Sequence, residues 1–273
     1  MKKPWGGRFT KKTASLVEAF TESISFDQRL YKYDIEGSIA HASMLAQCNL
    51  ITRRECGTII KGLRGIHKEI ESGTFQFKME REDIHMNIES ALIERIGDVA
   101  KKLHTARSRN DQIALDLRLW MRDQIQEIIE TIIALQSEFI VQAKTADNNI
   151  LPGFTHLQHA QPVMAGHYFL AYVEMLERDR TRLVDCRKRV NVSPLGACAL
   201  AGTTLDIKPE ITAKLLGFDS TFENSIDAVS DRDFCLEFAS VLAIISVHLS
   251  RFCEEWIIWS SQGFDFLDID DSY

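Results

Sequence analysis

The fold of this chain is decided by ten residues, Leu103-His-Thr-Ala-Arg-Ser-Arg-Asn-Asp-Gln112, and by the helical pattern that follows them. Apolar residues recur from Ile113 to Phe139 at spacings of three, four or seven, or close to them. The pattern predicts one helix over about residues 110–146, on the order of 50 Å long at 1.5 Å per residue. A helix of that length is typical of a bundle, which can be shared between subunits. We therefore expect an all-α fold.

The same ten residues predict a turn that binds a carboxylate. Arg107 and Arg109 can each present a fork of donors, and Thr105, Ser108 and Asn110 add shorter donors beside them. A helix N-terminus adds the partial positive charge of its unpaired amides. The alternative is an ordinary capped loop whose arginines meet surface acids. The turn alone does not decide between the two.

Composition narrows the class of protein. At 273 residues the chain can hold two domains, and its formal charge of -7 with no sustained basic run argues against a nucleic-acid partner. The sequence opens without the pattern of a secretion signal, and its six cysteines lack C-x-x-C spacing. We therefore expect a cytoplasmic protein with reduced thiols. The eight histidines show neither H-x-x-x-H nor H-E-x-x-H spacing, so no metal is expected.

Helical periods and caps predict the other elements. No proline lies between Pro4 and Pro152, which removes the commonest helix breaker from half the chain. Thr52 and Glu55 form a capping box for a helix that Gly73 would end. Further helices are expected over residues 30–45, from Glu82-Asp-Ile-His85 to Gly97, over 163–190, from Pro209 to Gly217, and over 234–259. Trp5-Gly-Gly-Arg-Phe9 predicts either an ordered arm or a disordered tail.

The expected helix over residues 234–259 is apolar on nearly every side. Its segment Phe238–Leu249 has no formal charge apart from possible protonation of His248, but a bilayer span needs about 20 apolar residues. A helix of this kind must be buried on nearly every side, so we expect it inside a bundle completed by other subunits. The charges of the long helix, in contrast, are expected to face solvent or flanking helices and to have no catalytic role: Asp116, Arg118, Arg122 and Glu127.

The segment Leu151-Pro-Gly-Phe-Thr-His-Leu-Gln-His-Ala-Gln-Pro162 interrupts the helical pattern with two prolines and a glycine. Pro162 suits the first position of the next helix, so His156 is expected on a loop that is fixed at both ends. An imidazole placed in this way can act as a general acid or base. A surface or core histidine without a role is the alternative.

Six segments together resemble the argininosuccinate lyases of the fumarase/aspartase superfamily, in that family's order and across essentially the whole chain. They are Trp5-Gly-Gly-Arg-Phe9, Glu82-Asp-Ile-His85, His104-Thr-Ala-Arg-Ser-Arg-Asn-Asp-Gln112, Gly153-Phe-Thr-His-Leu-Gln158, Ala160-Gln-Pro162 and Ser230-Asp-Arg-Asp-Phe234. The resemblance implies an all-α homotetramer with a central bundle of about twenty helices and active sites that each combine three chains. We accordingly expect a small N-terminal helical domain over residues 1–109 and a long-helix bundle domain over 110–273, incomplete at its C-terminal end.

The resemblance also implies an activity. The family cleaves argininosuccinate to arginine and fumarate, in arginine biosynthesis and the urea cycle, without a metal or an organic cofactor. Carried over to matching positions, the acid/base role falls on His156. Substrate binding falls on six further residues: Ser23, Asp83, Ser108, Arg109, Asn110 and Thr155. Among them, Ser108 and Arg109 would hold the succinyl carboxylates, and Asp83 would lie near the arginine-like end.

One departure from the family pattern limits this expectation. In the family, the segment like Leu267–Tyr273 leads into a flexible loop with the catalytic serine and then into a third domain, whereas this sequence ends before that loop. We therefore expect no turnover by these 273 residues alone. Two alternatives remain open: a non-catalytic structural protein like the δ-crystallins, and a sister lyase acting on adenylosuccinate, aspartate or malate.

Overall fold

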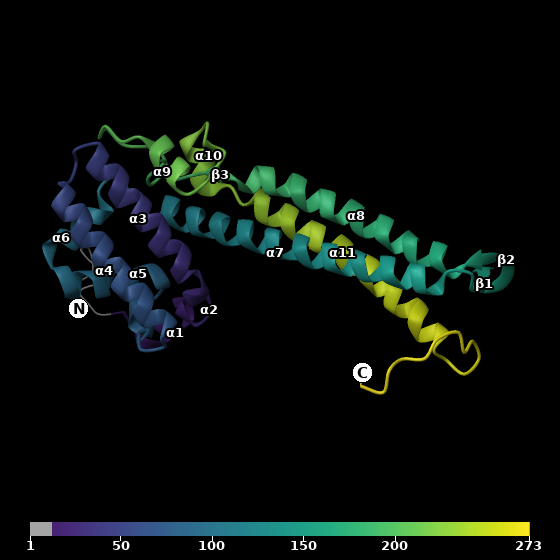
Figure 1. Ribbon diagram of the computed structural model, residues 1–273. Helices are drawn as coiled ribbons and strands as arrows, with labels where there is room; N and C mark the ends of the chain where they lie inside the picture. Colours follow the sequence, from purple (N-terminus) through teal and green to yellow (C-terminus); the bar gives the residue numbers. More distant parts are fainter. Residues whose placement is uncertain (1–12, 273) are drawn as a thin grey trace. The chain divides into compact units, whose positions relative to one another are not determined.

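The computed structural model describes residues 13–272, which are mostly helical, as the all-α prediction requires. They form two compact units (Figure 1). The first unit comprises Met1–Met121 with Asn191–Asp231, and the second comprises Arg122–Val190 with Arg232–Tyr273. The segment Trp5–Phe9 lies outside the described residues, and the domain boundary expected between residues 109 and 110 stays a prediction.

Short and medium helices make up the first unit. Its α-helices are α1 (Ser15–Thr21), α2 (Ile24–Asp27), α3 (Tyr31–Gln47), α4 (Arg53–Glu71), α5 (Ile84–Ile96), α6 (Asp98–Lys101), α9 (Pro209–Leu215) and α10 (Ser225–Ser230). Its 3₁₀ helices are η2 (Gln28–Leu30), η3 (Met79–Arg81) and η4 (Lys102–His104). Two short parallel strands pair between them, β3 (Val192–Ser193) and β4 (Ser220–Thr221).

The helices α3, α4 and α5 enclose the main core of the first unit (Figure 1). The apolar face of α4 is fully buried there, including Ile59, Leu63 and Ile66. The predicted capping box at Thr52 is present, because its hydroxyl accepts from the backbone N–H of Glu55 and the Glu55 carboxylate accepts from the backbone N–H of Thr52. These contacts confirm the sequence-based prediction for this helix.

The long helix α7 (Arg109–Ala146) has 38 residues and confirms the helix expected over 110–146. Its first turns belong to the first unit, where Leu115 and Leu119 pack with Leu195 and Phe218. The start of α7 is thus fixed against the segment that returns to this unit after residue 190. This packing determines where the residues of the turn before α7 lie.

The second unit contains the rest of α7 with α8 (Ala165–Val190) and α11 (Asp233–Trp259), which lie side by side (Figure 1). Aromatic rings join the three helices. The Phe139 and Phe252 ring centroids are 4.8 Å apart, those of Tyr172 and Phe252 4.9 Å, and those of Phe252 and Trp256 4.6 Å. Ring pairs at these distances add to the free energy gained by burying apolar area.

A β-hairpin replaces the loop that the sequence predicts between α7 and α8. Strand β1 (Ile150–Thr155) pairs antiparallel with β2 (Gln158–Met164), and Pro162 lies inside β2 opposite Pro152. The prediction that Pro162 begins the next helix is wrong, since α8 starts at Ala165. Both prolines suit a two-stranded ribbon, because an edge position does not need their missing N–H.

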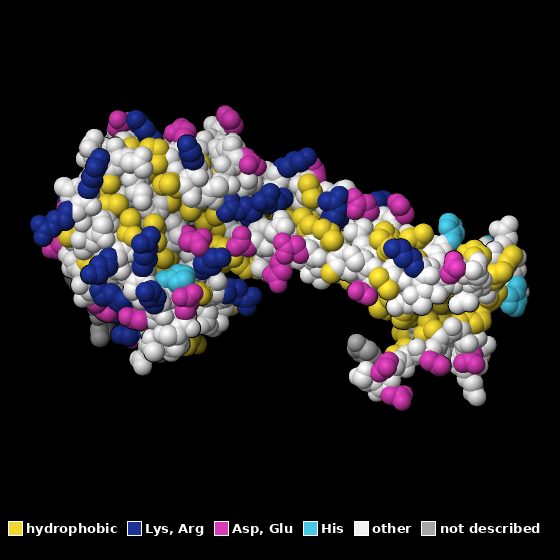
Figure 2. All heavy atoms as spheres, viewed as in Figure 1, with side chains coloured by type: hydrophobic (Ala, Val, Ile, Leu, Met, Phe, Trp, Pro, Cys, Tyr) yellow, Lys and Arg dark blue, Asp and Glu magenta, His cyan; other side chains and the backbone are white. Residues whose placement is uncertain are grey.

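Helix α11 is only partly buried within one chain. Leu236, Val247 and Ile257 are 67%, 65% and 60% exposed, although the sequence predicts burial on nearly every side. Figure 2 shows hydrophobic side chains on the visible surface of the helices of this unit. Among the described residues, α11 alone has the length and hydropathy to cross a membrane, criteria that the core helix of a soluble protein also meets.

Candidate active site

The arginine turn, residues 105–112, places donors at the N-terminus of α7. The hydroxyl of Ser108 accepts a hydrogen bond of 3.3 Å from the backbone N–H of Asn110, and the backbone N–H of Ser108 donates to Asp111 Oδ1 over 2.9 Å. The exposed Asn110 donates from Nδ2 to the carbonyl of Ala199 over 2.7 Å. Hydroxyl and amide groups therefore gather where the helix dipole favours an anion.

Arg109 lies between two acids without a hydrogen bond to either. Its guanidinium is 3.7 Å from Asp83 Oδ1 and 3.7 Å from Glu89 Oε2, and a quarter of its side chain is exposed. Asp83 is the N-cap of α5 and accepts from the backbone N–H of Met86 over 2.6 Å. Burial raises the pKa of Asp83, and the charge of Arg109 partly offsets this rise. The long ion pairs leave the guanidinium fork able to bind a carboxylate.

Ser23 is held beside Asp83 by a strained turn at Glu82. The backbone of Glu82 has φ 66° and ψ -62°, and the N–H of Asp83 donates to the carbonyl of Arg81 over 2.7 Å, which makes a rare type of γ-turn. The carbonyl of Glu82 accepts from the N–H groups of Ser23 and Ile24 at 2.8 and 3.0 Å. Strain of about 1–3 kcal/mol at such a residue persists only where surrounding contacts impose it.

Asp27 joins these residues and was not a candidate in the sequence. The hydroxyl of Ser23 donates to Asp27 Oδ2 over 2.6 Å, and Asp27 Oδ1 accepts from the backbone N–H of Ile84 over 3.1 Å. Burial raises the pKa of Asp27; the Ser23 bond lowers it, and the charge of Asp83 raises it. The first unit thus brings Ser23, Asp83 and Arg109 into one neighbourhood, with Ser108 and Asn110 next to Arg109 in the chain.

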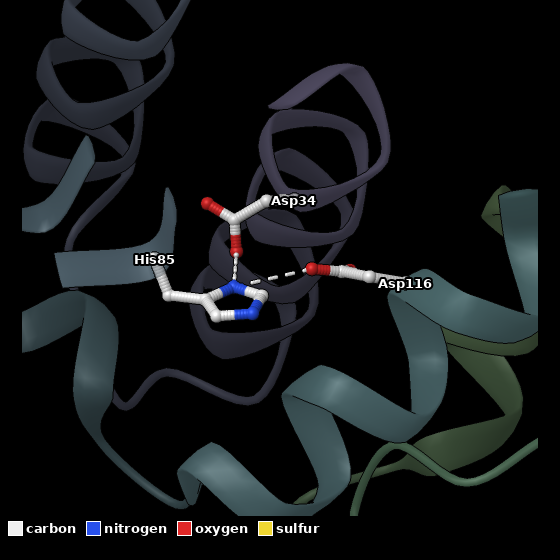
Figure 3. A group of neighbouring side chains, drawn as sticks. All are labelled: Asp34, His85 and Asp116. Atoms are coloured by element: carbon white, nitrogen blue, oxygen red, sulfur yellow. Dashed lines mark hydrogen bonds and ion pairs between the residues drawn. The ribbon is translucent and has the colours of Figure 1, made fainter. Parts of the chain in front are cut away.

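Behind the arginine turn lies a buried cluster of Asp34, His85 and Asp116, from α3, α5 and α7 (Figure 3). His85 Nδ1 lies 2.9 Å from Asp34 Oδ1 and 3.3 Å from Asp116 Oδ2. Gln112 also donates to Asp34 Oδ1. Burial, followed by the charge of Asp34, raises the pKa of Asp116 well above its usual value.

Of the two environments expected for Asp116, solvent or flanking helices, the structure shows the second, because its side chain is fully buried against α3 and α5. The helical period of α7 alone could not show that two polar partners meet it from α3 and α5. The three ligand atoms lie within 4.8 Å of one another, close enough to surround a cation. However, hydrogen bonds from His85 and Gln112 already occupy Asp34, and we interpret the cluster as a proton-linked network.

Thr155 and His156 belong to the second unit, on the β1–β2 hairpin. Thr155 pairs with Gln158, so His156 and Leu157 form a two-residue turn with φ values of 55° and 57°. Left-handed φ at both positions is the geometry of a type I′ turn, which normally favours Asn or Gly. The turn holds the exposed imidazole of His156 at the tip of the hairpin.

Comparisons with known proteins identify relatives over nearly the whole chain. A family profile described as Lyase matches residues 7–273. The argininosuccinate lyase of Alkaliphilus metalliredigens is 58% identical over 271 residues, which are 99% of this chain and 59% of that protein. The argininosuccinate lyase of Pseudomonas syringae pv. tomato is 55% identical over 269 residues, 98% of this chain and 58% of that protein. This chain therefore spans about three-fifths of the length of these relatives.

Solved structures share the fold. An EDDS lyase variant with bound fumarate is 30% identical and has a TM-score of 0.83, covering 97% of this chain and 53% of its own. A 3-carboxy-cis,cis-muconate lactonizing enzyme from Pseudomonas putida, 21% identical, has a TM-score of 0.73 over 92% of this chain and 60% of its own. These neighbours confirm the fumarase/aspartase-like fold. Since the lyase profile matches all but the first six residues, the chain belongs to the lyase family.

Proposed function

We propose that this chain forms part of an argininosuccinate lyase, which eliminates arginine from argininosuccinate and leaves fumarate. The observation that carries the proposal is 58% identity over 99% of the chain to a protein of that name. The EDDS lyase variant supports it further, because a relative of the same fold binds fumarate, one of the two expected products. Both the activity and the substrate are those of the full-length relative, of which this chain covers 59%.

The proposed chemistry explains why the site collects donors. A base removes a proton from the carbon next to one succinyl carboxylate, and that carboxylate gains a second negative charge. The electron pair then forms the C=C bond of fumarate as the C–N bond breaks, and an acid gives a proton to the leaving guanidinium nitrogen. Donors on Ser108, Arg109 and Asn110 stabilise the doubly charged intermediate more than the substrate. This differential binding is what accelerates the reaction.

The remaining residues have narrower proposed roles. His156 serves as the acid or base, and a well-placed group of this kind contributes about 10²–10⁴-fold to the rate. Thr155 and Ser23 bind the substrate, and Asp83 binds near its arginine-like end. The proposed steps include no cofactor or metal, as the family resemblance implies.

We also propose that the protein assembles as a homotetramer in the cytoplasm, with each active site shared between subunits. The exposed apolar residues of α11 support assembly, since large exposed apolar patches mark interaction surfaces. The six cysteines are free thiols, which supports a reducing compartment.

A chimera tests the proposed activity. In it, residues 1–273 are followed by the part of the Alkaliphilus metalliredigens relative that lies beyond the matched region. We expect fumarate release from argininosuccinate, followed by ultraviolet absorbance. A folded chimera without this activity would reject the proposal. Adenylosuccinate, aspartate and EDDS serve as competing substrates, because the likeness to an EDDS lyase makes a sister reaction the specific alternative.

A further inference from the structure

We propose that Asp111 is a positioning residue that fixes the arginine turn to the small-residue loop, residues 194–202, and that this loop is therefore part of the substrate site. The proposal rests on the proposed function, since the residues so positioned are Ser108, Arg109 and Asn110. The many small residues of this loop let backbones approach closely, either inside a bundle or beside a ligand.

Asp111 uses both carboxylate oxygens to join the two segments. Its side chain is fully buried; Oδ1 accepts from the N–H of Ser108 at 2.9 Å, and Oδ2 accepts from the N–H groups of Gly196 and Cys198 at 3.1 and 2.8 Å. Burial raises the pKa of this carboxyl, and the three N–H bonds followed by the charge of Arg107 counteract the rise. A buried carboxylate is retained where hydrogen bonds of this kind compensate for lost hydration.

A simple helix cap does not account for this arrangement. The bond from Ser108 is local, as in many helix N-termini, and it occupies only Oδ1. Oδ2 instead binds amides that lie 85 and 87 residues further along the chain. Asp111 therefore links the start of α7 to a segment that local helix formation would leave free.

The small-residue loop is shaped to meet Asp111. Gly196 has φ 109°, and a Cβ atom there would lie 2.6 Å from Pro209 Cγ, so only glycine fits. Cys198 has φ 56°, which is uncommon for a residue with a side chain. Both residues point their amides at one carboxylate oxygen. Unusual backbone conformations of this kind persist where the surrounding contacts hold them.

Two further hydrogen bonds join the arginine turn to the small-residue loop. Asn110 Nδ2 donates to the carbonyl of Ala199 over 2.7 Å, and the Cys198 thiol lies 3.3 Å from the carbonyl of Ala106. Asn110 is itself a proposed substrate-binding residue. A shift of the loop would therefore move the donors of the turn, and a displacement of about 1 Å in such groups can lower a rate about 10²-fold.

Two variants test the link from its two sides. Asp111→Asn keeps one acceptor oxygen for the loop amides but turns an NH₂ group toward the N–H of Ser108, so two donors face each other. Gly196→Ala disturbs the loop side without changing a charge. Asp98→Asn, in an exposed carboxylate of the same unit, is the matched control.

Kinetics of the chimera provide the first measurement. We expect both variants to lower kcat/KM for argininosuccinate about 10–100-fold and to raise the inhibition constant of fumarate, with the control unchanged. Loss of folded enzyme would reduce kcat and leave KM and the fumarate inhibition constant as they were. That second pattern would overturn the positioning role.

Hydrogen exchange of the 273-residue chain provides the second measurement and does not need activity. We expect Asp111→Asn to speed amide exchange in both residues 105–112 and residues 194–202, with α4 unaffected. Unchanged exchange in the two segments would overturn the link. If the chimera without substitutions releases no fumarate, the proposed function fails, and the exchange result alone decides whether Asp111 joins the two segments.

Discussion

His85 and Asp34 form a hydrogen-bonded pair that is shut off from water, with 2.9 Å between Nδ1 and Oδ1 and side chains only 3% and 1% exposed. Asp116 Oδ2 lies 3.3 Å from the same nitrogen. Two ionised carboxylates at this spacing would repel each other strongly without solvent. We therefore expect Asp116 to carry a proton in the folded protein.

Asparagine substitutions at these two positions should have unequal effects. Asp116→Asn replaces a neutral acid by a neutral group of the same shape. It also removes the cost of keeping a buried carboxyl protonated at neutral pH, so it should raise the free energy of unfolding. Asp34→Asn disturbs the buried oxygen that accepts from His85 and Gln112 and should lower the free energy of unfolding by about 1–3 kcal/mol. Urea unfolding of the two variants at neutral pH measures both effects. A loss of stability in Asp116→Asn equal to that in Asp34→Asn would contradict a protonated Asp116.

The pH dependence of stability should differ between the parent chain and Asp116→Asn. The pKa of Asp116 is raised above 3.8 in the folded state, so folding favours the protonated acid. The contribution of Asp116 to the free energy of unfolding is fully present below pH about 3.8, and it is lost as pH rises toward the folded-state pKa. Asparagine does not titrate, so Asp116→Asn does not lose this stability. The variant should therefore become more stable relative to the parent as pH rises from about 3.8 toward the folded-state pKa. A difference that stays constant would contradict the assignment.

Replacing His156 should affect turnover more than binding. In the chimera, His156→Asn should lower kcat about 10²–10⁴-fold with a small change in KM, because a proton-transfer group is lost. Asparagine tolerates the left-handed φ of 55° well, so the hairpin turn should persist. His159→Asn on the adjoining strand is the control for a lost histidine in the same hairpin. An unchanged rate for His156→Asn would remove this residue from the mechanism.

Arg109→Lys should weaken binding, because a single ammonium group cannot copy the two parallel bonds of a guanidinium to a carboxylate. We expect the KM for argininosuccinate and the inhibition constant of fumarate to rise together, about tenfold or more for a loss of roughly 1.5–3 kcal/mol in charged hydrogen bonds. Arg53→Lys at the exposed start of α4 is the matched control. Unaltered fumarate inhibition would show that Arg109 does not hold a carboxylate.

The exposed apolar positions of α11 should control assembly. Val247→Asp puts a charge on a side chain that is 65% exposed in one chain and should shift the oligomer toward smaller species. Sedimentation velocity of the chimera measures the change, and Thr58→Asp, at a partly exposed polar position of α4, should leave it unaffected. A chimera that sediments as a monomer without any substitution would refute the proposed tetramer.

Helix positions could be predicted from the sequence where local signals determine them. The capping box of Thr52 and Glu55, the N-cap Asp83 and the terminal Gly97 all lie at the expected ends of helices. The apolar period gave α7 its expected extent for the same reason. The hairpin was missed because proline in a short edge ribbon resembles proline at a helix start, and only strand pairing separates the two.

The residues that position the candidate site could not be predicted in this way. Asp111 and Asp116 follow the arginine turn in a helix, where acids usually face water, and their partners are distant in sequence. Asp27 likewise gains its role from the turn at Glu82, far along the chain. Local patterns carry no information on such long-range contacts. The family motifs indicated only the segments of sequence that contain or adjoin the candidate site residues. The roles proposed for the motif residues themselves await the experiments above.

The turn at His156 and Leu157 has a consequence for protein engineering. Both residues adopt a backbone geometry that Asn-Gly would occupy with less strain, so a stability-guided redesign of the hairpin would replace them first. Such a redesign would yield a more heat-resistant scaffold and discard the imidazole with the same substitution. Efforts to raise the thermal stability of this protein for biotechnological use should therefore leave His156 and Leu157 unchanged and introduce stabilising substitutions elsewhere.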